Sequence, residues 1–212
     1  MDGTVSRLAP PLKAPSSRAK LLDAALLALR ERGYNATTVD DLCAVAGVTK
    51  GAFFHHFKSK EDLAIAAADY WSAITSEMFA QASYHQRADP LDRMLGYIDL
   101  RAELIRGAPA QFTCVVGTMT QEIFQTNPRI REACFASISG HAEQLEDDIA
   151  EAIDLYHVDI GFTAKSLALH TQAVLQGAFI LAKAKDDPQA ATDSIAHLRR
   201  YFELLFDQKS RG

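Results

Sequence analysis

Apolar residues recur at helical intervals along most of the chain, and glycines interrupt the pattern. The first stripe predicts a helix that begins at Ser17 and stops at Gly33, with an inward face of Leu21, Leu22, Ala25, Leu26 and Leu29. Thr38 is typical of a helix start, and the helix that it opens is expected to end at Gly47. This part of the chain therefore predicts two amphipathic helices.

Two further hydroxyl residues mark helix starts. Thr49 opens a helix that can run for barely two turns before Phe57, and Ser59 opens a long one. Phe53 and Phe57 stand at helical spacing, so we expect them to anchor the short helix in the core.

Prolines open the helices beyond residue 84. Asp89-Pro90, Asn127-Pro128 and Asp187-Pro188 each join a capping side chain to a proline that the first helical turn tolerates. Gly107 is expected to close the first of these helices. The whole pattern predicts an all-α protein of about nine helices, with no convincing strand.

Composition agrees with a helical globular protein. The 212 residues include 11 glycines and 7 prolines, together below the roughly 12% of an average protein, which argues against collagen-like, proline-rich and most all-β structures. With 48% hydrophobic and 23% charged residues, the chain can bury a sizeable core. No cationic and apolar leader is found, and the longest uncharged stretch, 166–182, is too polar for a membrane span. We therefore expect a cytoplasmic protein without a membrane partner.

Cysteines and histidines give little sign of metal or cofactor chemistry. Cys43, Cys114 and Cys134 are an odd, sparse set without metal-ligand spacing, so we expect reduced thiols. His55 and His56 are adjacent on a helix and point about 100° apart, which does not favour a shared metal. No cofactor is expected.

Charge is distributed unevenly along the chain. Residues 1–62 carry a net charge of +2 and residues 63–212 one of −7, which suggests that the N-terminal part meets a polyanion. Residues 38–60 read TVDDLCAVAGVTKGAFFHHFKSK, which is a helix, a turn containing glycine and a short second helix. This layout is that of a helix-turn-helix, whose second helix enters the major groove of DNA.

Candidate DNA contacts follow from this layout. Lys50 and Gly51 stand at the N-terminus of the short helix, where a lysine can donate to guanine and a glycine lets the backbone approach the bases. His55, His56 and Lys60 stand where phosphate contacts are expected.

The same residues resemble the TetR family of bacterial transcriptional repressors. The similarity runs from Arg18 to about Leu63, and the segment AGVTKGAFFHHFKSKEDL carries it. The resemblance implies a homodimer that binds a roughly palindromic operator in double-stranded DNA, and a C-terminal body that binds a small-molecule effector. By position, it implies phosphate contacts from Thr38, His56 and Lys60 and groove contacts from Lys50, Gly51, Ala52 and His55.

Phe54 departs from the family pattern, which usually has tyrosine there. Phe54 has no hydroxyl to donate to a phosphate, so we expect one positioning contact to be lost while an apolar contact with DNA remains. Phe54 and Thr49, the N-cap of the short helix, complete the candidate DNA-binding set.

The uncharged stretch 107–121 is rich in small and hydroxyl residues and is expected to line a cavity. The candidate wall comprises Trp71, Ile74, Met78, Met94, Tyr97, Ile98, Phe112, Cys114 and Met119. So few charges predict an apolar ligand with one or two polar groups, hydrogen-bonded by Thr118, His170, Gln172 or Gln176. For each wall residue taken singly, core packing is at least as strong an interpretation.

The stretch 166–182 and the stripe of the last helix give two apolar helices. In the resembled family, the last two helices of each subunit build a four-helix dimer interface. The implied interface residues are Leu167, Val174, Gly177, Ala178, Leu181, Ile195, Leu198, Tyr201, Phe202 and Leu205. Packing within one subunit is the alternative for part of this set.

The sequence therefore predicts a flexible arm (1–15), a helix-turn-helix domain (16–62) and a helical effector-binding and dimerisation domain (63–212). The leading hypothesis is a homodimeric repressor that a small, mainly apolar ligand releases from its operator. A thiol sensor acting through Cys114 is the alternative, although an inert thiol is favoured because no cation lies within seven residues of it. An enzyme is disfavoured, since no catalytic triad order, paired carboxylates or phosphate-binding glycine loop is found.

Overall fold

The computed structural model describes residues 15–158 and 161–207, which form ten α-helices, one short 3-10 helix and no strand. The all-α prediction is confirmed. The elements are α1 (Ser17–Arg32), α2 (Val39–Ala46), α3 (Lys50–His56), α4 (Lys60–Ala80), η1 (Ser83–Gln86), α5 (Pro90–Glu103), α6 (Pro109–Phe112), α7 (Val115–Ile123), α8 (Pro128–Tyr156), α9 (Ala164–Lys185) and α10 (Gln189–Phe206). Except for Pro15, the expected arm of residues 1–15 lies outside the described residues. None of the described helices has the length and apolar character needed to cross a bilayer.

Side-chain caps hold the first helices at the expected positions. Thr38 and Asp41 form a reciprocal capping box at α2: the Asp41 N–H donates to Thr38 Oγ1 at 3.1 Å, and the Thr38 N–H donates to the Asp41 carboxylate at 2.9 Å. Thr49 and Ser59 each cap a helix start, of α3 and α4, by one hydrogen bond. Gly47 ends α2 with a φ of 62°, a left-handed conformation that glycine adopts without strain.

The segment between α5 and α8 differs from the expectation. Helix α5 ends at Glu103 rather than at Gly107. Ala108, the residue before Pro109, is extended, as residues before proline usually are. Pro109 then opens α6, and the extended Thr113 separates α6 from α7. The stretch 107–121 therefore contains two helices, which brings the total in the described residues to ten.

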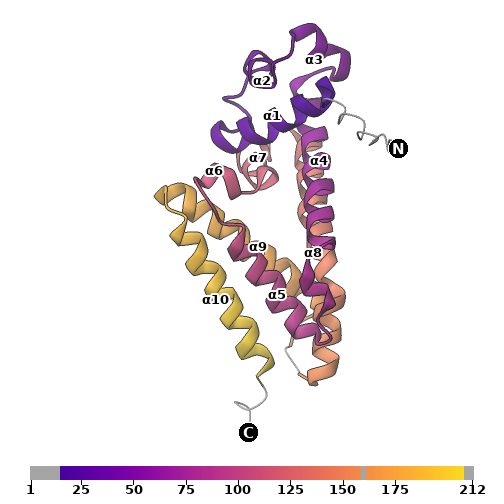
Figure 1. The fold of residues 1–212 in the computed structure, drawn as a ribbon, viewed down its shortest axis with the longest axis vertical. Coiled ribbons are helices and arrows are strands. Elements are labelled where there is room, and N and C mark those ends of the chain that lie inside the picture. Colours follow the sequence, from indigo (N-terminus) through magenta and orange to yellow (C-terminus); the bar gives the residue numbers. More distant parts are fainter. Residues whose placement is uncertain (1–14, 159–160, 208–212) are drawn as a thin grey trace, which may run out of the picture.

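Two large apolar cores occupy the length of the molecule, and a small cluster of Ala178, Ala182 and Ala191 joins α9 to α10. The first core joins α1, α2, α3 and the first half of α4 to α7 and the start of α8, and the second joins α5, η1, α9, α10 and the rest of α8. Helices α4 and α8 pack against each other and run lengthwise from the helix-turn-helix end toward the other end (Figure 1). Helix α4 crosses the expected domain boundary between residues 62 and 63 without a break.

Candidate nucleic-acid interface and ligand cavity

Helix α3 is the short second helix of the helix-turn-helix and lies at the tip of the molecule (Figure 1). A helix of seven residues is marginally stable by itself. Phe53 and Phe57 anchor it, because they are 0% and 5% exposed and their ring centres lie 5.8 Å apart within the first core. The prediction that both belong to the core is confirmed, and the opposite side of α3 is left facing solvent.

This solvent-facing side and the adjoining helix starts present most of the candidate DNA contacts. Ala52 and His56 are half-buried, and the exposed candidates are Thr38, Thr49, Lys50, Gly51, Phe54 and His55. The side chain of Phe54 is 53% exposed and meets Phe53 edge to face, with 5.1 Å between ring centres. An aromatic ring on the surface of this helix is available for an apolar contact in the groove.

Lys50 pairs with a carboxylate of the first helix of the motif. Its Nζ lies 2.8 Å from Asp40 Oδ1, and the hydrogen bond to Asp40 raises the pKa of the lysine. Both side chains are more than half exposed, at 57% and 71%. Water screens such a pair strongly, so a guanine or phosphate can replace Asp40 as the partner of Lys50 at little cost.

Lys60 is bound within the domain, and the phosphate contact expected of it stays a prediction. Its Nζ donates to the backbone carbonyls of Tyr34 and Thr37, each at 3.0 Å, and lies 4.1 Å from the centre of the Tyr34 ring. Partial burial lowers the pKa of this ammonium. Lys60 therefore stabilises the turn between α1 and α2, whose carbonyls need donors after α1 ends.

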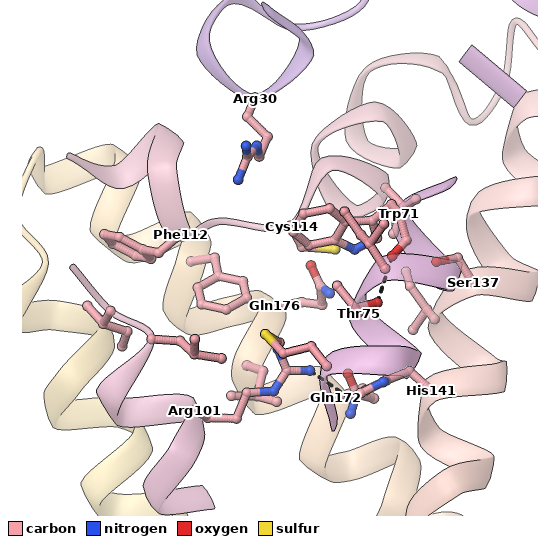
Figure 2. Close-up of a pocket in the computed structure, with 18 of the residues that line it drawn as sticks. Arg30, Trp71, Thr75, Arg101, Phe112, Cys114, Ser137, His141, Gln172 and Gln176 are labelled. Atoms are coloured by element: carbon pink, nitrogen blue, oxygen red, sulfur yellow. Dashed lines mark hydrogen bonds between the residues drawn. The ribbon is translucent and has the colours of Figure 1, made fainter. Parts of the chain in front are cut away.

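A cavity of about 400 Å³ lies where the two cores meet, within the size range of small-molecule sites (Figure 2). Helices α4 to α9 supply its wall, and Arg30 of α1 reaches it from the helix-turn-helix end. The wall includes seven of the residues expected there: Trp71, Ile74, Met78, Phe112, Cys114, Gln172 and Gln176.

Six other residues expected on the wall lie elsewhere: Met94, Tyr97, Ile98, Thr118, Met119 and His170. Met94, Ile98 and Met119 are at most 1% exposed, because their helix faces are turned into the cores. Tyr97 is buried behind the wall. Thr118 Oγ1 accepts a hydrogen bond from Lys183 at 2.7 Å, and His170 is exposed on α9.

A polar cluster at one end of the cavity escaped the sequence analysis. Arg101 Nε donates to the Tyr97 hydroxyl at 2.9 Å, and its Nη2 lies 2.7 Å from His141 Nε2. Gln172 Nε2 donates to the same hydroxyl at 3.3 Å. Burial, with a smaller effect of the Arg101 charge, lowers the pKa of His141 to about 3, so the imidazole is neutral and its Nε2 accepts. The position of Arg101 four residues after Tyr97 was the available signal, since such residues share a helix face.

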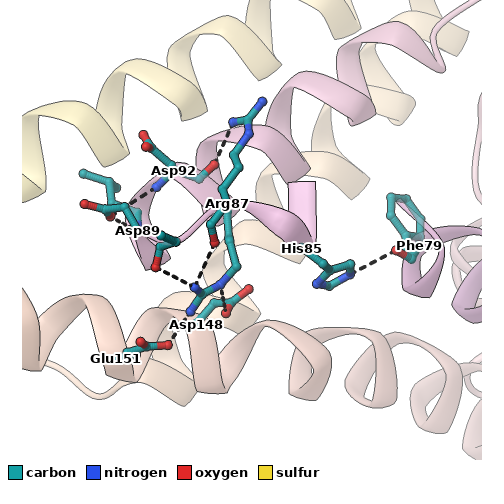
Figure 3. A network of polar contacts seen from close by, with 10 residues as sticks. Phe79, His85, Arg87, Asp89, Asp92, Asp148 and Glu151 are labelled. Carbon is teal, nitrogen blue, oxygen red and sulfur yellow. Dashed lines mark hydrogen bonds and ion pairs between the residues drawn. The ribbon is translucent and has the colours of Figure 1, made fainter. Parts of the chain in front are cut away.

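A second polar network joins α5 and α8, two of the helices that carry this cluster, at positions further along them (Figure 3). Arg93 of α5 binds Asp148 of α8 with 2.6 Å between Nε and Oδ1, and it also pairs with Glu151. The side chains of Arg93 and Asp148 are only 14% and 19% exposed. Their hydrogen bond raises the pKa of the arginine. This clamp holds α5 and α8 in register, which places Arg101 opposite His141.

Arg30 connects the helix-turn-helix unit to the cavity. Its Nη1 donates to the carbonyl of Gln111 on α6 at 2.9 Å, and its guanidinium lies 5.4 Å from the centre of the Trp71 ring. Lys183 of α9 donates to the Arg30 carbonyl at 3.0 Å. Burial lowers the pKa of both cations. No sequence signal links these residues, because Gln111 and Lys183 stand 81 and 153 positions away from Arg30.

Half of the expected dimer residues are buried within the subunit. Leu167, Ala178, Ile195, Leu198 and Phe202 are at most 2% exposed, because α9 and α10 turn these positions into the core. They are core residues rather than a free face. Val174, Gly177 and Leu205 are half-buried, whereas Leu181 and Tyr201 are exposed. Further exposed residues on these two helices are Leu169, Ala173, Ile180 and Leu204.

Two family models match the chain. The model for bacterial regulatory proteins of the tetR family matches residues 21–67. The model for the tetracyclin repressor-like C-terminal domain matches residues 90–198, just over half of the chain.

Individual proteins give the same picture. The chain is 29% identical over 103 residues to the transcriptional regulator AcuR of Cereibacter sphaeroides, covering 49% of this chain and 47% of AcuR. It is 34% identical over 98 residues to the HTH-type transcriptional repressor KstR2 of Mycobacterium tuberculosis, covering 45% and 48%. The matches thus span about half the length of these relatives. The crystal structure of a regulatory protein TetR from Rhodobacter sphaeroides has a TM-score of 0.77 at 23% identity, over 87% of this chain and 97% of that one, which shows a shared fold.

The two lysines of the motif are expected to respond differently to mutation. Lys50→Ala should lower the affinity for the DNA site and reduce the slope of log affinity against log salt by about 1, because one charged contact is lost. Lys60→Met should lower the free energy of unfolding by about 1–3 kcal/mol, because two hydrogen bonds from a charged donor are lost, and its effect on that slope tests the phosphate contact expected of Lys60. DNA titrations at several salt concentrations and urea unfolding measure both effects. An unchanged slope in Lys50→Ala would count against the charged contact expected of Lys50.

The depressed pKa of His141 makes folding stability depend on pH. In the unfolded chain the imidazole takes up a proton below about pH 6.5, whereas in the folded chain it stays neutral down to about pH 3. Because only the unfolded chain takes up this proton, the free energy of unfolding is highest above about pH 6.5. It falls toward pH 3 by about 1.4 kcal/mol per pH unit. We expect urea unfolding of His141→Gln to show a flatter pH dependence between about pH 7 and pH 4.5. An unchanged slope in His141→Gln contradicts the prediction.

Proposed function

The chain belongs to the TetR family of bacterial DNA-binding transcriptional regulators, and on this basis we propose that it is a homodimeric repressor that a small molecule releases from its operator. The observation that carries the proposal is the exposed side of α3, which Phe53 and Phe57 hold rigidly against a body with a ligand-sized cavity. A regulator of chromosomal DNA acts in the cytoplasm, so the proposal includes that location.

In the proposed complex, the two α3 helices of a dimer enter successive major grooves about 34–36 Å apart. Lys50 exchanges Asp40 for a guanine or a phosphate, and Gly51 allows the backbone to come close to the bases. Phe54 supplies an apolar contact with a thymine methyl or a sugar. Thr38 and His55 flank this contact and bind the phosphates that set its register.

Two connections link the occupancy of the cavity to the position of α3. Helix α4 presents Trp71 and Thr75 to the cavity and begins beside α3, so a small tilt at the wall displaces the DNA-binding end. Helix α1 reaches the wall through Arg30, which is bonded to Gln111 of the body. A ligand acts on DNA affinity only as far as it binds one arrangement of these helices better than the other.

The exposed apolar side of α9 and α10 supports the dimer. Two such helix pairs form a four-helix bundle about a two-fold axis when each subunit presents the same surface. The residues available for it are Leu169, Ala173, Ile180, Leu181, Tyr201 and Leu204. The relatives, which are named as transcriptional regulators, favour neither catalysis nor the Cys114 thiol sensor.

Selection from random duplex DNA tests the proposed function. We expect the full chain to enrich an inverted repeat whose half-sites are about one helical turn apart, and Lys50→Ala to enrich it poorly. Small molecules that change the fluorescence of Trp71, the single tryptophan, should then release the protein from that site, because Trp71 stands in the cavity wall. Absence of an enriched repeat, or ligands that bind the cavity and leave DNA bound, would contradict the proposal.

A charge placed on the α9–α10 surface should separate the subunits. Leu181 is 52% exposed, so Leu181→Glu leaves the core intact but buries a carboxylate in the proposed interface. We expect a monomer by sedimentation velocity and loss of binding to the inverted repeat. Leu155→Glu, on a 56% exposed residue of α8, is the matched control and should remain a dimer. A dimeric Leu181→Glu protein would place the interface on another surface.

A further inference from the structure

The cavity wall contains two arginines, and no Asp or Glu is found among the described residues that line it. Arg30 and Arg101 are its cations, and the other lining groups are apolar or neutral under ordinary conditions. Neither arginine takes part in an ion pair within the described part of the chain. Charged groups withdrawn from water are ordinarily paired with an opposite charge, so this wall lacks an anion.

Arg101 has only neutral partners. Its guanidinium contacts the Tyr97 hydroxyl and the His141 imidazole and lies 4.5 Å from the centre of the Phe79 ring. These contacts fix the plane of the guanidinium without neutralising its charge. No hydrogen bond from its Nη1 is found to any described residue, which leaves donors for a further acceptor.

Arg30 is a weaker anion site than Arg101. Backbone carbonyls of Leu26 and Gln111 accept hydrogen bonds from its Nε and Nη1 at 2.8 and 2.9 Å, and these dipoles partly satisfy the guanidinium. The two arginines lie at opposite ends of the cavity, with Phe112, Trp71 and Gln176 between them (Figure 2). An anionic group at Arg101 therefore leaves the rest of its molecule against an aromatic and aliphatic wall.

We propose that the effector is an amphipathic organic acid whose carboxylate pairs with Arg101 and whose apolar part packs against Trp71 and Phe112. The planar guanidinium matches a carboxylate in a two-point hydrogen-bonded pair. The inference rests on the proposed function, because it names the ligand class of the same cavity. It revises the mainly apolar ligand expected from the sequence, since the uncharged stretch 107–121 supplies only part of the wall.

Matched probes measured without DNA test the inference. The first probe set is octanoate, octanamide and octylamine. The second is 4-phenylbutyrate, 4-phenylbutanamide and 4-phenylbutylamine. Each probe is titrated into the full chain while Trp71 fluorescence is recorded. We expect each acid to bind about 10- to 100-fold more tightly than its amide, as a charged hydrogen-bonded pair contributes, and each amine to bind most weakly.

Three arginine variants locate the anion. Arg101→Gln should abolish the preference for acids, and Arg101→Lys, which keeps the charge and guards against a folding defect, should retain part of it. Arg106→Gln removes an exposed arginine beyond the end of α5 and should retain all of it. Arg30→Gln should also keep the preference, because the carboxylate lies at the other end.

The outcomes separate this inference from the proposed function. Equal affinities for acid and amide, no binding of either acid at about 1 mM, or a preference lost in Arg30→Gln instead of Arg101→Gln overturns the assignment to Arg101. Each of these results leaves operator release by a neutral ligand standing. An acid that binds through Arg101 and does not release the operator supports the ligand class and contradicts the proposed function.

Discussion

A helix of seven residues does not hold its shape in water by itself, and this constraint governs the rest of the molecule. Helix α3 is stable because Phe53 and Phe57 are buried in the first core. That core does not end with the helix-turn-helix but continues into α7 through Met119 and Ile123. The exposed side of α3 and one wall of the cavity are therefore two surfaces of a single packed unit, and a closely packed unit transmits small displacements.

Hydrogen bonds at the same junction also join α1 and the turn after it to the rest of the molecule. Glu122 of α7 accepts a hydrogen bond from the Asn35 N–H at 2.9 Å, just after α1, and Arg30 and Lys183 tie α1 to α6 and α9. These bonds are few, and one of them, from Arg30 to Gln111, lies in the cavity wall. In the proposed mechanism, a ligand that competes for one of them, or changes the position of α4 beside Trp71, biases the arrangement of the DNA-binding helices without unfolding either core.

Local signals predicted the DNA-binding end well, and long-range contacts explain where prediction failed. The capping box of Thr38 and the buried pair Phe53 and Phe57 follow from residues three or four positions apart. The hydrogen bonds of Lys60 within the domain were missed because its partners, the carbonyls of Tyr34 and Thr37, belong to a distant turn and carry no side-chain signature. Apolar periodicity likewise marks a helix face as buried without saying whether its own subunit or a second copy covers it.

The sequence by itself determined the helices, most of their ends and the helix-turn-helix, because capping, periodicity and turn chemistry act over a few residues. Only the tertiary structure decided the electrostatics of the cavity. Tyr97 and Arg101 stand 40 or more positions from His141 and Gln172, and the meeting of these residues depends on how α5, α8 and α9 pack. A chain with a net charge of −5 thus surrounds a cavity whose wall is cationic, since burial and neighbours, rather than total charge, set the local field.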